Sequence, residues 1–187
     1  MSILPEILEH NRRFVAAKQY EQYATDALPN KKIVIVTCMD TRLVELLPAA
    51  MNLRQGDAKV LKTAGAIVAH PFGGIMRSIL VAVYQLGARE IAVVGHHGCG
   101  MTGMNSERIL EAARERGISE SVIATLRDSP KLDVARWLRG FERPSEGVVE
   151  SVRTIRNHPL LPNDVLVHGL LISPETGELE MVDTGGV

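Results

Sequence analysis

Short apolar runs rich in β-branched residues alternate along the chain with segments that repeat apolar positions every three or four residues. The runs 33–36 and 90–95 lack the polar alternation of a half-exposed strand, which is typical of strands covered on both faces, and the run 58–65 has the pattern of a further strand that ends at Gly65. The segment 71–86 has the clearest helical repeat and is followed by Gly87, a residue that suits the end of a helix. We therefore predict strands in the three runs and a helix over 71–86. The apolar face of that helix comprises Phe72, Ile75, Met76, Ile79, Leu80, Val83 and Leu86.

Weaker helical patterns lie before, between and after these elements. The end of the chain, 164–182, has a strand pattern, a turn at 175–177 and a second strand pattern, which predicts an antiparallel pair. The segment 117–127 has no convincing strand pattern, and we assign no element to it. Helices are predicted over 3–23, 43–51, 104–116 and 131–139, and over the segment after Pro144 that includes Val148, Val149, Val152 and Ile155.

Strands that alternate with helices predict an α/β fold. We expect a central, mostly parallel β-sheet with an antiparallel edge strand and helices on both faces. The chain has 187 residues, the usual length of one domain, and shows no repeat or linker. We therefore expect a single domain over 1–187, in which 1–30 form an N-terminal helical arm.

The composition argues against a protein that binds nucleic acid or a membrane. Lys and Arg total 21 against 22 for Asp and Glu, so a net charge of −1 gives no electrostatic basis for binding nucleic acid or an acidic membrane. No apolar run approaches the ~18 residues of a membrane span. The first residues also lack the charge order of a secretory signal, and we expect a cytoplasmic protein.

The chain has only two cysteines, and both follow predicted strands. Cys38 ends the first strand, with Asp40 two residues later, and His96 and Cys99 follow the third. The carboxyl ends of parallel strands share one edge of a sheet, so these side chains should meet there. Two cysteines at equivalent positions favour a metal over ordinary core packing, and thiolate with imidazole is a ligand set for Zn²⁺. An iron–sulfur site would need four thiols.

The two motifs resemble those of a known family. The sequence CMDTR at 38–42 and the sequence GHHGCG at 95–100 are similar to those of the β-class carbonic anhydrases. The resemblance implies Cys38, His96 and Cys99 as zinc ligands and a zinc-dependent, reversible hydration of carbon dioxide to bicarbonate and a proton by zinc-bound hydroxide. It also implies a homodimer or a dimer of dimers, with active sites near the subunit interface.

Asp40 and Arg42 would form a catalytic pair by the same resemblance. Arg42 can bind a carboxylate with two hydrogen bonds, which would keep Asp40 ionised and able only to accept a proton or hydrogen bond. Asp40 could instead bind zinc and close the site. Without Cys38 beside them, the two residues would read as an ordinary surface ion pair.

The chain departs from the family around these motifs. Residues 62–66 read KTAGA where family members usually have RNAGN, and 78–82 read SILVA where they often have Ser-x-Glu-Tyr-Ala. The chain therefore resembles a divergent branch, and three alternatives stay open. They are a carbonyl sulfide or carbon disulfide hydrolase at the same zinc site, a non-catalytic zinc-binding protein, and an enzyme that uses Cys38 as a nucleophile.

Other residues near the two motifs could contribute to the site, but the sequence says less about their roles. Gly65 ends the second predicted strand and would let substrate or metal approach the backbone, which places it in the substrate pocket. His97 lacks the His-x-x-Cys spacing and is interpreted as a neighbour that could transfer protons, as is His70 near the mouth. The glycines at 98, 100 and 103 match a dinucleotide-binding pattern, but no strand with an acidic residue follows at the required distance.

Overall fold

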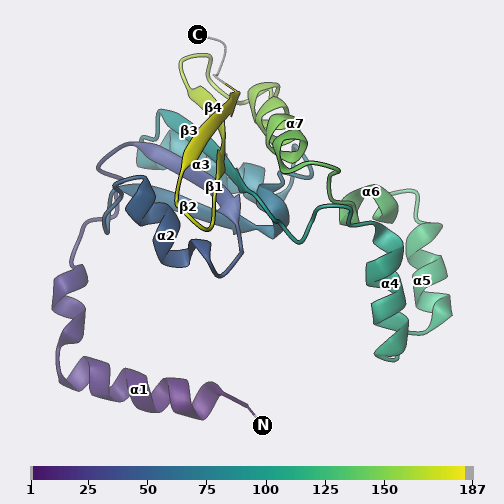
Figure 1. Cartoon of the computed structure of the whole chain (residues 1–187), viewed down its shortest axis with the longest axis horizontal. Helices are drawn as coiled ribbons and strands as arrows, with labels where there is room; N and C mark the ends of the chain where they lie inside the picture. Colours follow the sequence, from purple (N-terminus) through teal and green to yellow (C-terminus); the bar gives the residue numbers. More distant parts are fainter. Residues whose placement is uncertain (1, 184–187) are drawn as a thin grey trace.

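One five-stranded sheet organises the chain. The computed structural model describes residues 2–183 and orders the strands β2-β1-β3-β4-β5 (Figure 1). The pairs β2–β1, β1–β3 and β3–β4 are parallel, whereas β5 runs antiparallel to β4 at the edge. The predicted fold class is confirmed. The strands are β1 (Ile33–Cys38), β2 (Ala58–Thr63), β3 (Glu90–His96), β4 (Leu166–Ile172) and β5 (Leu179–Asp183).

Helices connect the strands and extend beyond them. Among residues 2–183, no helix has the length and apolar character needed to cross a bilayer. Two short 3₁₀ segments, η1 (Gln19–Tyr23) and η2 (Ala64–Ala66), lie before β1 and after β2. The α-helices are α1 (Leu4–Ala16), α2 (Leu43–Ala50), α3 (Gly74–Leu86), α4 (Ser106–Glu115), α5 (Glu120–Arg127), α6 (Val134–Leu138) and α7 (Pro144–Arg156).

The central strands β1 and β3 are covered on both faces, which explains their unbroken apolar runs. Because side chains alternate along a strand, Val34 and Val36 of β1 enter one core and Ile35 enters the other. Helices α3 and α7 close the first core, and α2 closes the second. All three of these β1 side chains are fully buried.

The register of β1 and β3 positions the candidate residues. Ile33 pairs with Glu90 and Thr37 with Val94, so the two strands end side by side. Cys38 is the last residue of β1, and His96 is the last residue of β3. The parallel pairing therefore brings the two motifs to the same edge of the sheet, as the sequence predicted.

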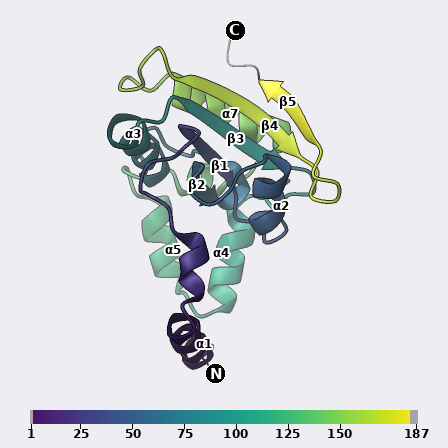
Figure 2. The same ribbon diagram turned by 90° about the vertical axis from the view of Figure 1, so that its left-hand side faces the viewer.

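The N-terminal segment differs from the single helix predicted over 3–23. Helix α1 ends at Ala16, because Lys18 adopts a left-handed conformation with φ of 52°, and η1 then begins at Gln19. Figures 1 and 2 show α1 extending away from the sheet at the N-terminal end of the chain. None of its residues is buried, so the apolar face of α1 is exposed to solvent in the single chain.

Two further differences concern helix positions. Helix α3 begins at Gly74, because residues before it form a turn in which the Gly73 amide donates to the carbonyl of His70. Phe72 therefore lies outside the helix and is 72% exposed, contrary to its predicted place on the buried face. The segment with no assigned element contains helix α5, which buries Ile123.

Candidate metal centre

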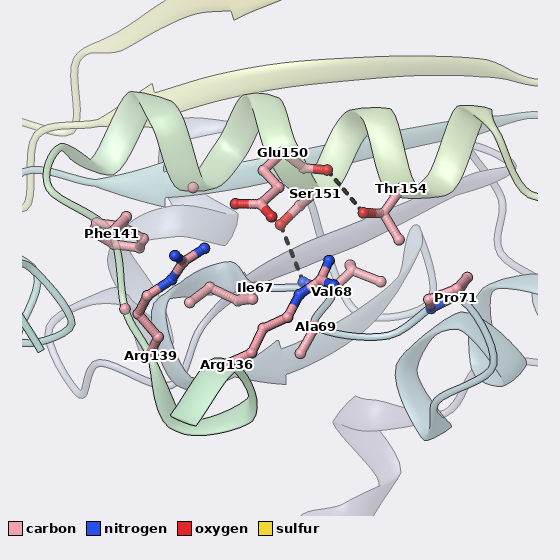
Figure 3. A pocket seen from close by; sticks show the side chains of 12 residues that line it. Ile67, Val68, Ala69, Pro71, Arg136, Arg139, Phe141, Glu150, Ser151 and Thr154 are labelled. Carbon is pink, nitrogen blue, oxygen red and sulfur yellow. Dashed lines mark hydrogen bonds between the residues drawn. The ribbon is translucent and has the colours of Figure 1, made fainter. Parts of the chain in front are cut away.

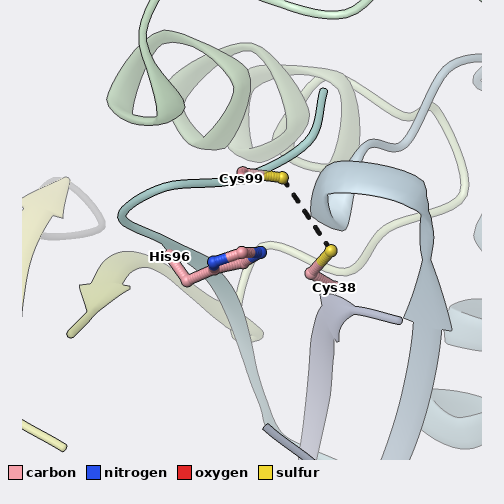
Figure 4. A group of neighbouring side chains, drawn as sticks. All are labelled: Cys38, His96 and Cys99. Atoms are coloured by element: carbon pink, nitrogen blue, oxygen red, sulfur yellow. Dashed lines mark hydrogen bonds between the residues drawn. The ribbon is translucent and has the colours of Figure 1, made fainter. Parts of the chain in front are cut away.

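Three buried side chains meet at the carboxyl end of the sheet. Cys38 comes from β1, His96 from β3 and Cys99 from the loop after β3 (Figure 4). One donor atom from each lies within 4.8 Å of the others, and the two Sγ atoms are 3.9 Å apart. All three side chains are at least nine-tenths buried. The structure thus brings together the three residues whose spacing suggested zinc ligands.

The imidazole of His96 has the orientation of a metal ligand. Its Nδ1 lies 2.9 Å from the carbonyl oxygen of His97 and can donate a hydrogen bond there, which leaves Nε2 without a proton. Nε2 is buried and has no hydrogen-bond partner among the described residues. A buried nitrogen lone pair without a partner is costly, and a cation would satisfy it. The donor set of two sulfurs and one nitrogen fits Zn²⁺.

The close contact between the thiols shifts their acidities in opposite directions. The Cys99 side chain lowers the pKa of Cys38, assisted by His96 and by the backbone amides of Asp40 and Gly65. The same contact raises the pKa of Cys99. The pKa of His96 is raised, chiefly by Cys38. One sulfur of the pair is therefore readily available as a thiolate before a metal binds, which favours the capture of a soft cation.

Arg42 clamps the carboxylate of Asp40 beside this group. Its Nε and Nη2 atoms lie 3.0 Å from Oδ1 and 2.8 Å from Oδ2, and its backbone amide also donates to Oδ1. These contacts hold the pKa of Asp40 well below its usual range. The same Nη2 donates to the carbonyl of Gly98, so Arg42 joins the loop after β1 to the loop after β3. An ionised carboxylate is thus fixed next to the three donor atoms.

Gly65 packs closely against Met101 and Phe141, next to the three donor side chains. It is buried and has φ of 70°, a backbone conformation that favours glycine. A Cβ atom placed there would lie 3.0 Å from Cγ of Met101 and 3.0 Å from Cε1 of Phe141. The position therefore tolerates no side chain without movement of its neighbours. The close packing at Gly65 is with these two side chains, and its place in the substrate pocket stays a prediction.

The two other histidines singled out in the sequence have different surroundings. His97 lies on the surface, and its Nε2 contacts Oε1 of Glu180 on β5 at 2.7 Å. His70 accepts a hydrogen bond from the amide of Phe72 in the turn before α3. Neither belongs to the group of three donors found within residues 2–183.

Two neighbours of the site were not found from the sequence. Phe141 precedes α7 and packs with Met101 in the core that contains both cysteines. Glu180 on β5 pairs with His97 across the edge of the sheet. Neither position lies in a motif, and both reach the site through long-range packing. Glu180 is an exposed charged position of an edge strand, which by itself is ordinary.

Comparisons with known proteins agree on one family. A family model described as carbonic anhydrase matches residues 33–179. YvdA of Bacillus subtilis (strain 168), a protein with a provisional carbonic anhydrase name, is 59% identical over 185 residues, covering 99% of this chain and 93% of its own. The crystal structure of β-carbonic anhydrase isoform I from Trichomonas vaginalis superposes with a TM-score of 0.89 at 35% identity, covering 99% of this chain and 100% of that one.

A second group of relatives carries another activity in its name. A carbon disulfide hydrolase of Acidithiobacillus thiooxidans is 29% identical over 157 residues, which span 80% of this chain and 76% of that protein. Relatives of this chain therefore carry two different activities in their names.

Proposed function

The chain belongs to the β-class carbonic anhydrase family, and from this premise we propose that it catalyses the reversible hydration of carbon dioxide to bicarbonate and a proton. We propose Cys38, His96 and Cys99 as the ligands of one Zn²⁺ ion. The observation that carries the proposal is the position of Asp40, whose Oδ2 lies 3.6 Å from the unpartnered Nε2 of His96. A structural zinc site has four protein ligands and no need of a clamped carboxylate beside it.

The chemistry of the donor set explains why the site also needs the Asp40–Arg42 ion pair. When bound, Zn²⁺ lowers the pKa of a coordinated water and so supplies a nucleophile near neutral pH. Two thiolates already balance the charge of the ion, which weakens this effect compared with a site of neutral imidazoles. The protein has to support the nucleophile by other means. Asp40 and Arg42 provide that support.

Asp40 acts as a hydrogen-bond acceptor because its pKa is held well below the usual range by Arg42. An ionised carboxylate can only accept, so it orients the reacting oxygen with a lone pair toward the substrate carbon. Arg42 is a positioning residue that fixes both carboxylate oxygens. Released from Arg42, the Asp40 carboxylate would be free to occupy the fourth ligand position, which would close the site.

The apolar wall next to the donors suits a small uncharged substrate. Met101 and Phe141 pack against the core that contains both cysteines, and Gly65 lies against both of them. Carbon dioxide has no hydrogen-bond donor and needs little more than a dry pocket next to the nucleophile. We propose Gly65 as part of that pocket.

Hydrolysis of carbon disulfide is the second candidate. The observation in its favour is the carbon disulfide hydrolase name of relatives at 29% identity. Carbon disulfide and carbonyl sulfide are linear, uncharged and electrophilic at carbon, so the same nucleophile and the same Asp40 acceptor serve them. Direct assay with each substrate separates the two functions.

The proposed function is tested by metal analysis together with assays on both substrates. We expect about one zinc per chain, rapid hydration of carbon dioxide in a stopped-flow indicator assay, and no release of hydrogen sulfide from carbon disulfide. The Asp40→Asn variant should keep its zinc and lose most of the hydration. Glu146→Gln is a matched control, because Glu146 forms a comparable clamp with Arg143 at the start of α7. Release of hydrogen sulfide without hydration of carbon dioxide would favour the second candidate. A zinc-loaded protein that is inactive on both substrates would refute both proposed functions.

We also propose that the chain works as a homodimer or a dimer of dimers in the cytoplasm. The open apolar face of α1 supports an assembly, since an isolated helix that buries none of its residues gains little from the rest of its own chain. The occupant that would cover this face is a second copy. Its exposed apolar residues are Ile3 at the N-cap, and Leu4, Ile7, Leu8 and Val15.

A further inference from the structure

A small cavity with a polar lining lies apart from the three donor side chains, between α6, α7 and the segment 67–69. Its volume is about 70 Å³. A cavity needs roughly 10–15 Å³ on this measure to hold one water molecule, so this one has room for a small ion. Figure 3 shows Arg136 and Arg139 pointing toward α7 from one side, and Glu150 and Ser151 pointing toward them from the other.

The guanidinium groups of Arg136 and Arg139 form no ion pair with another described residue. No carboxylate of residues 2–183 lies within 4.0 Å of Arg136 or Arg139, whereas Arg42, Arg114, Arg127 and Arg143 all form close ion pairs. Nor does either guanidinium donate a hydrogen bond to another described group. Two planar donor forks at one cavity are suited to an oxyanion, which can accept from both at once.

Ser151 adds a neutral donor in the wall. The residue is 1% exposed, and its Oγ accepts a hydrogen bond of 3.1 Å from the amide of Val68. Its own hydroxyl hydrogen has no acceptor among the described residues, so it remains available to a ligand in the cavity. A buried hydroxyl that lines a cavity and still has a donor to offer is consistent with a ligand that brings acceptors.

Glu150 limits the charge of that ligand. Two arginines and one glutamate give the lining a formal charge of +1, and the Glu150 carboxylate forms no ion pair with a described residue. This balance disfavours a cation. We propose that the cavity binds one small oxyanion of the class of inorganic phosphate or bicarbonate, held by Arg136, Arg139 and Ser151. This site does not depend on the proposed reaction.

The occupied cavity would share a wall with the metal centre. The ring of Phe141 lines the cavity and also lies against Gly65, beside Cys38. The segment that begins at Gly65 continues to Val68, whose amide is held by Ser151. A bound oxyanion therefore stabilises the segment whose first residues approach the candidate ligands.

The test is isothermal titration of the zinc-loaded protein with inorganic phosphate. We expect one phosphate per chain in the wild type and binding weakened about tenfold or more in Arg136→Gln and in Arg139→Gln, since each loses charge-assisted hydrogen bonds. Glu150→Gln should bind more tightly, because a negative charge leaves the lining. Arg153→Gln is the matched control, since Arg153 lies on α7 but does not line the cavity. Equal affinity in the wild type and both cavity variants would overturn the proposal.

A second measurement needs no substitution. Phosphate should protect Arg136 and Arg139 from modification by phenylglyoxal, read out by peptide mass spectrometry, while Arg153 reacts at the same rate with and without it. Unprotected cavity arginines at saturating phosphate would refute the site. Repeating both measurements with bicarbonate identifies the source of the ligand, and the tighter of the two anions is the natural occupant. Because the readout is binding at the arginines, a protein inactive on carbon dioxide would leave this result unchanged.

Discussion

The Nε2 atom of His96 lies 3.6 Å from Oδ2 of Asp40, with no hydrogen bond between them and none from Nε2 to any described group. The carboxylate is turned instead toward Arg42, which binds both of its oxygens. The open arrangement of the site thus depends on Arg42, because this arginine competes with the donor group for the same carboxylate.

Replacing Arg42 by Gln should therefore reduce turnover while zinc stays bound. Asp40 loses its bidentate partner, its pKa returns toward the ordinary range, and the carboxylate can move toward the metal. We expect a loss of about 10²-fold in kcat/KM, the scale of a mispositioned proton acceptor. Stopped-flow hydration and zinc analysis measure the two quantities. Arg143→Gln, which breaks the clamp on Glu146, is the control and should retain activity; a variant at Arg42 as fast as the wild type would contradict this role.

Zinc content should depend on each of the three donors. We expect about one zinc per chain in the wild type and a sharp loss in Cys38→Ser, His96→Ala or Cys99→Ser, because a tetrahedral site missing a ligand loses most of its affinity. A chelator should also lower the melting temperature of the wild type. His97→Ala should keep its metal, since His97 faces Glu180. Full zinc occupancy in both cysteine variants would refute the assignment.

Hydration should be weak near pH 6.5 and increase through the alkaline range. The thiolates make the ion a weaker acid than a site of three imidazoles would, so the nucleophile forms at higher pH. Protonation of Asp40 does not cause this loss of activity at low pH. Its folded pKa is lowered, so the stability that ionised Asp40 contributes is present above about pH 4 and is lost only as the pH falls further. A flat profile of kcat between pH 6 and 9 would contradict this prediction.

A side chain at position 65 should cost stability. In Gly65→Ala the Cβ atom would meet Met101 and Phe141 at 3.0 Å, and alanine would have to adopt φ of 70°. We expect a loss of about 1–3 kcal/mol in the free energy of unfolding, measured by urea denaturation. Gly74→Ala is the matched control, because that glycine opens α3 and a Cβ atom added to it would meet no atom within 4 Å. Equal stability of the two variants would show that the close packing at Gly65 is dispensable.

Assembly should depend on α1. Replacing Ile7 and Leu8 by Glu places charge on the exposed apolar face, whose own chain does not cover it. We expect light scattering to show a dimer or tetramer for the wild type and a smaller species for the double variant. Arg12→Glu on the same helix changes the charge of its polar side and should leave the assembly intact. A 20.4 kDa wild-type monomer at micromolar concentration would refute the expected homodimer.

Much of the fold and of the donor group was predictable from the sequence, because both depend on local signals. The β-branched runs marked the buried strands, and the parallel order fixed which strand ends share an edge, so Cys38 and His96 could be placed together. The end of α1 could not be predicted, because the left-handed residue there is Lys18, whereas glycine is the residue that usually adopts this conformation. Helix α5 carried only a short apolar repeat, and its buried residue, Ile123, finds its partners through packing.

The surroundings of the site were harder to predict. Phe141 reaches Gly65 from a segment outside every motif, and Glu180 reaches His97 from another strand. Such contacts depend on the paths of loops and on the register of an edge strand, for which a single sequence gives no periodic signal.

The pairing of β1 with β3 has a consequence for how the protein acquires its metal. Cys38 and Cys99 are separated by 61 positions and meet only after a parallel pair has formed around the β2 and α3 crossover. Zinc bound by all three residues would therefore require the β1–β3 pair, whereas the ligands of a zinc finger come from one short segment. We therefore expect the sheet to form before zinc binds, so that in a zinc-poor cell the metal-free chain would stay folded and ready for activation without new synthesis.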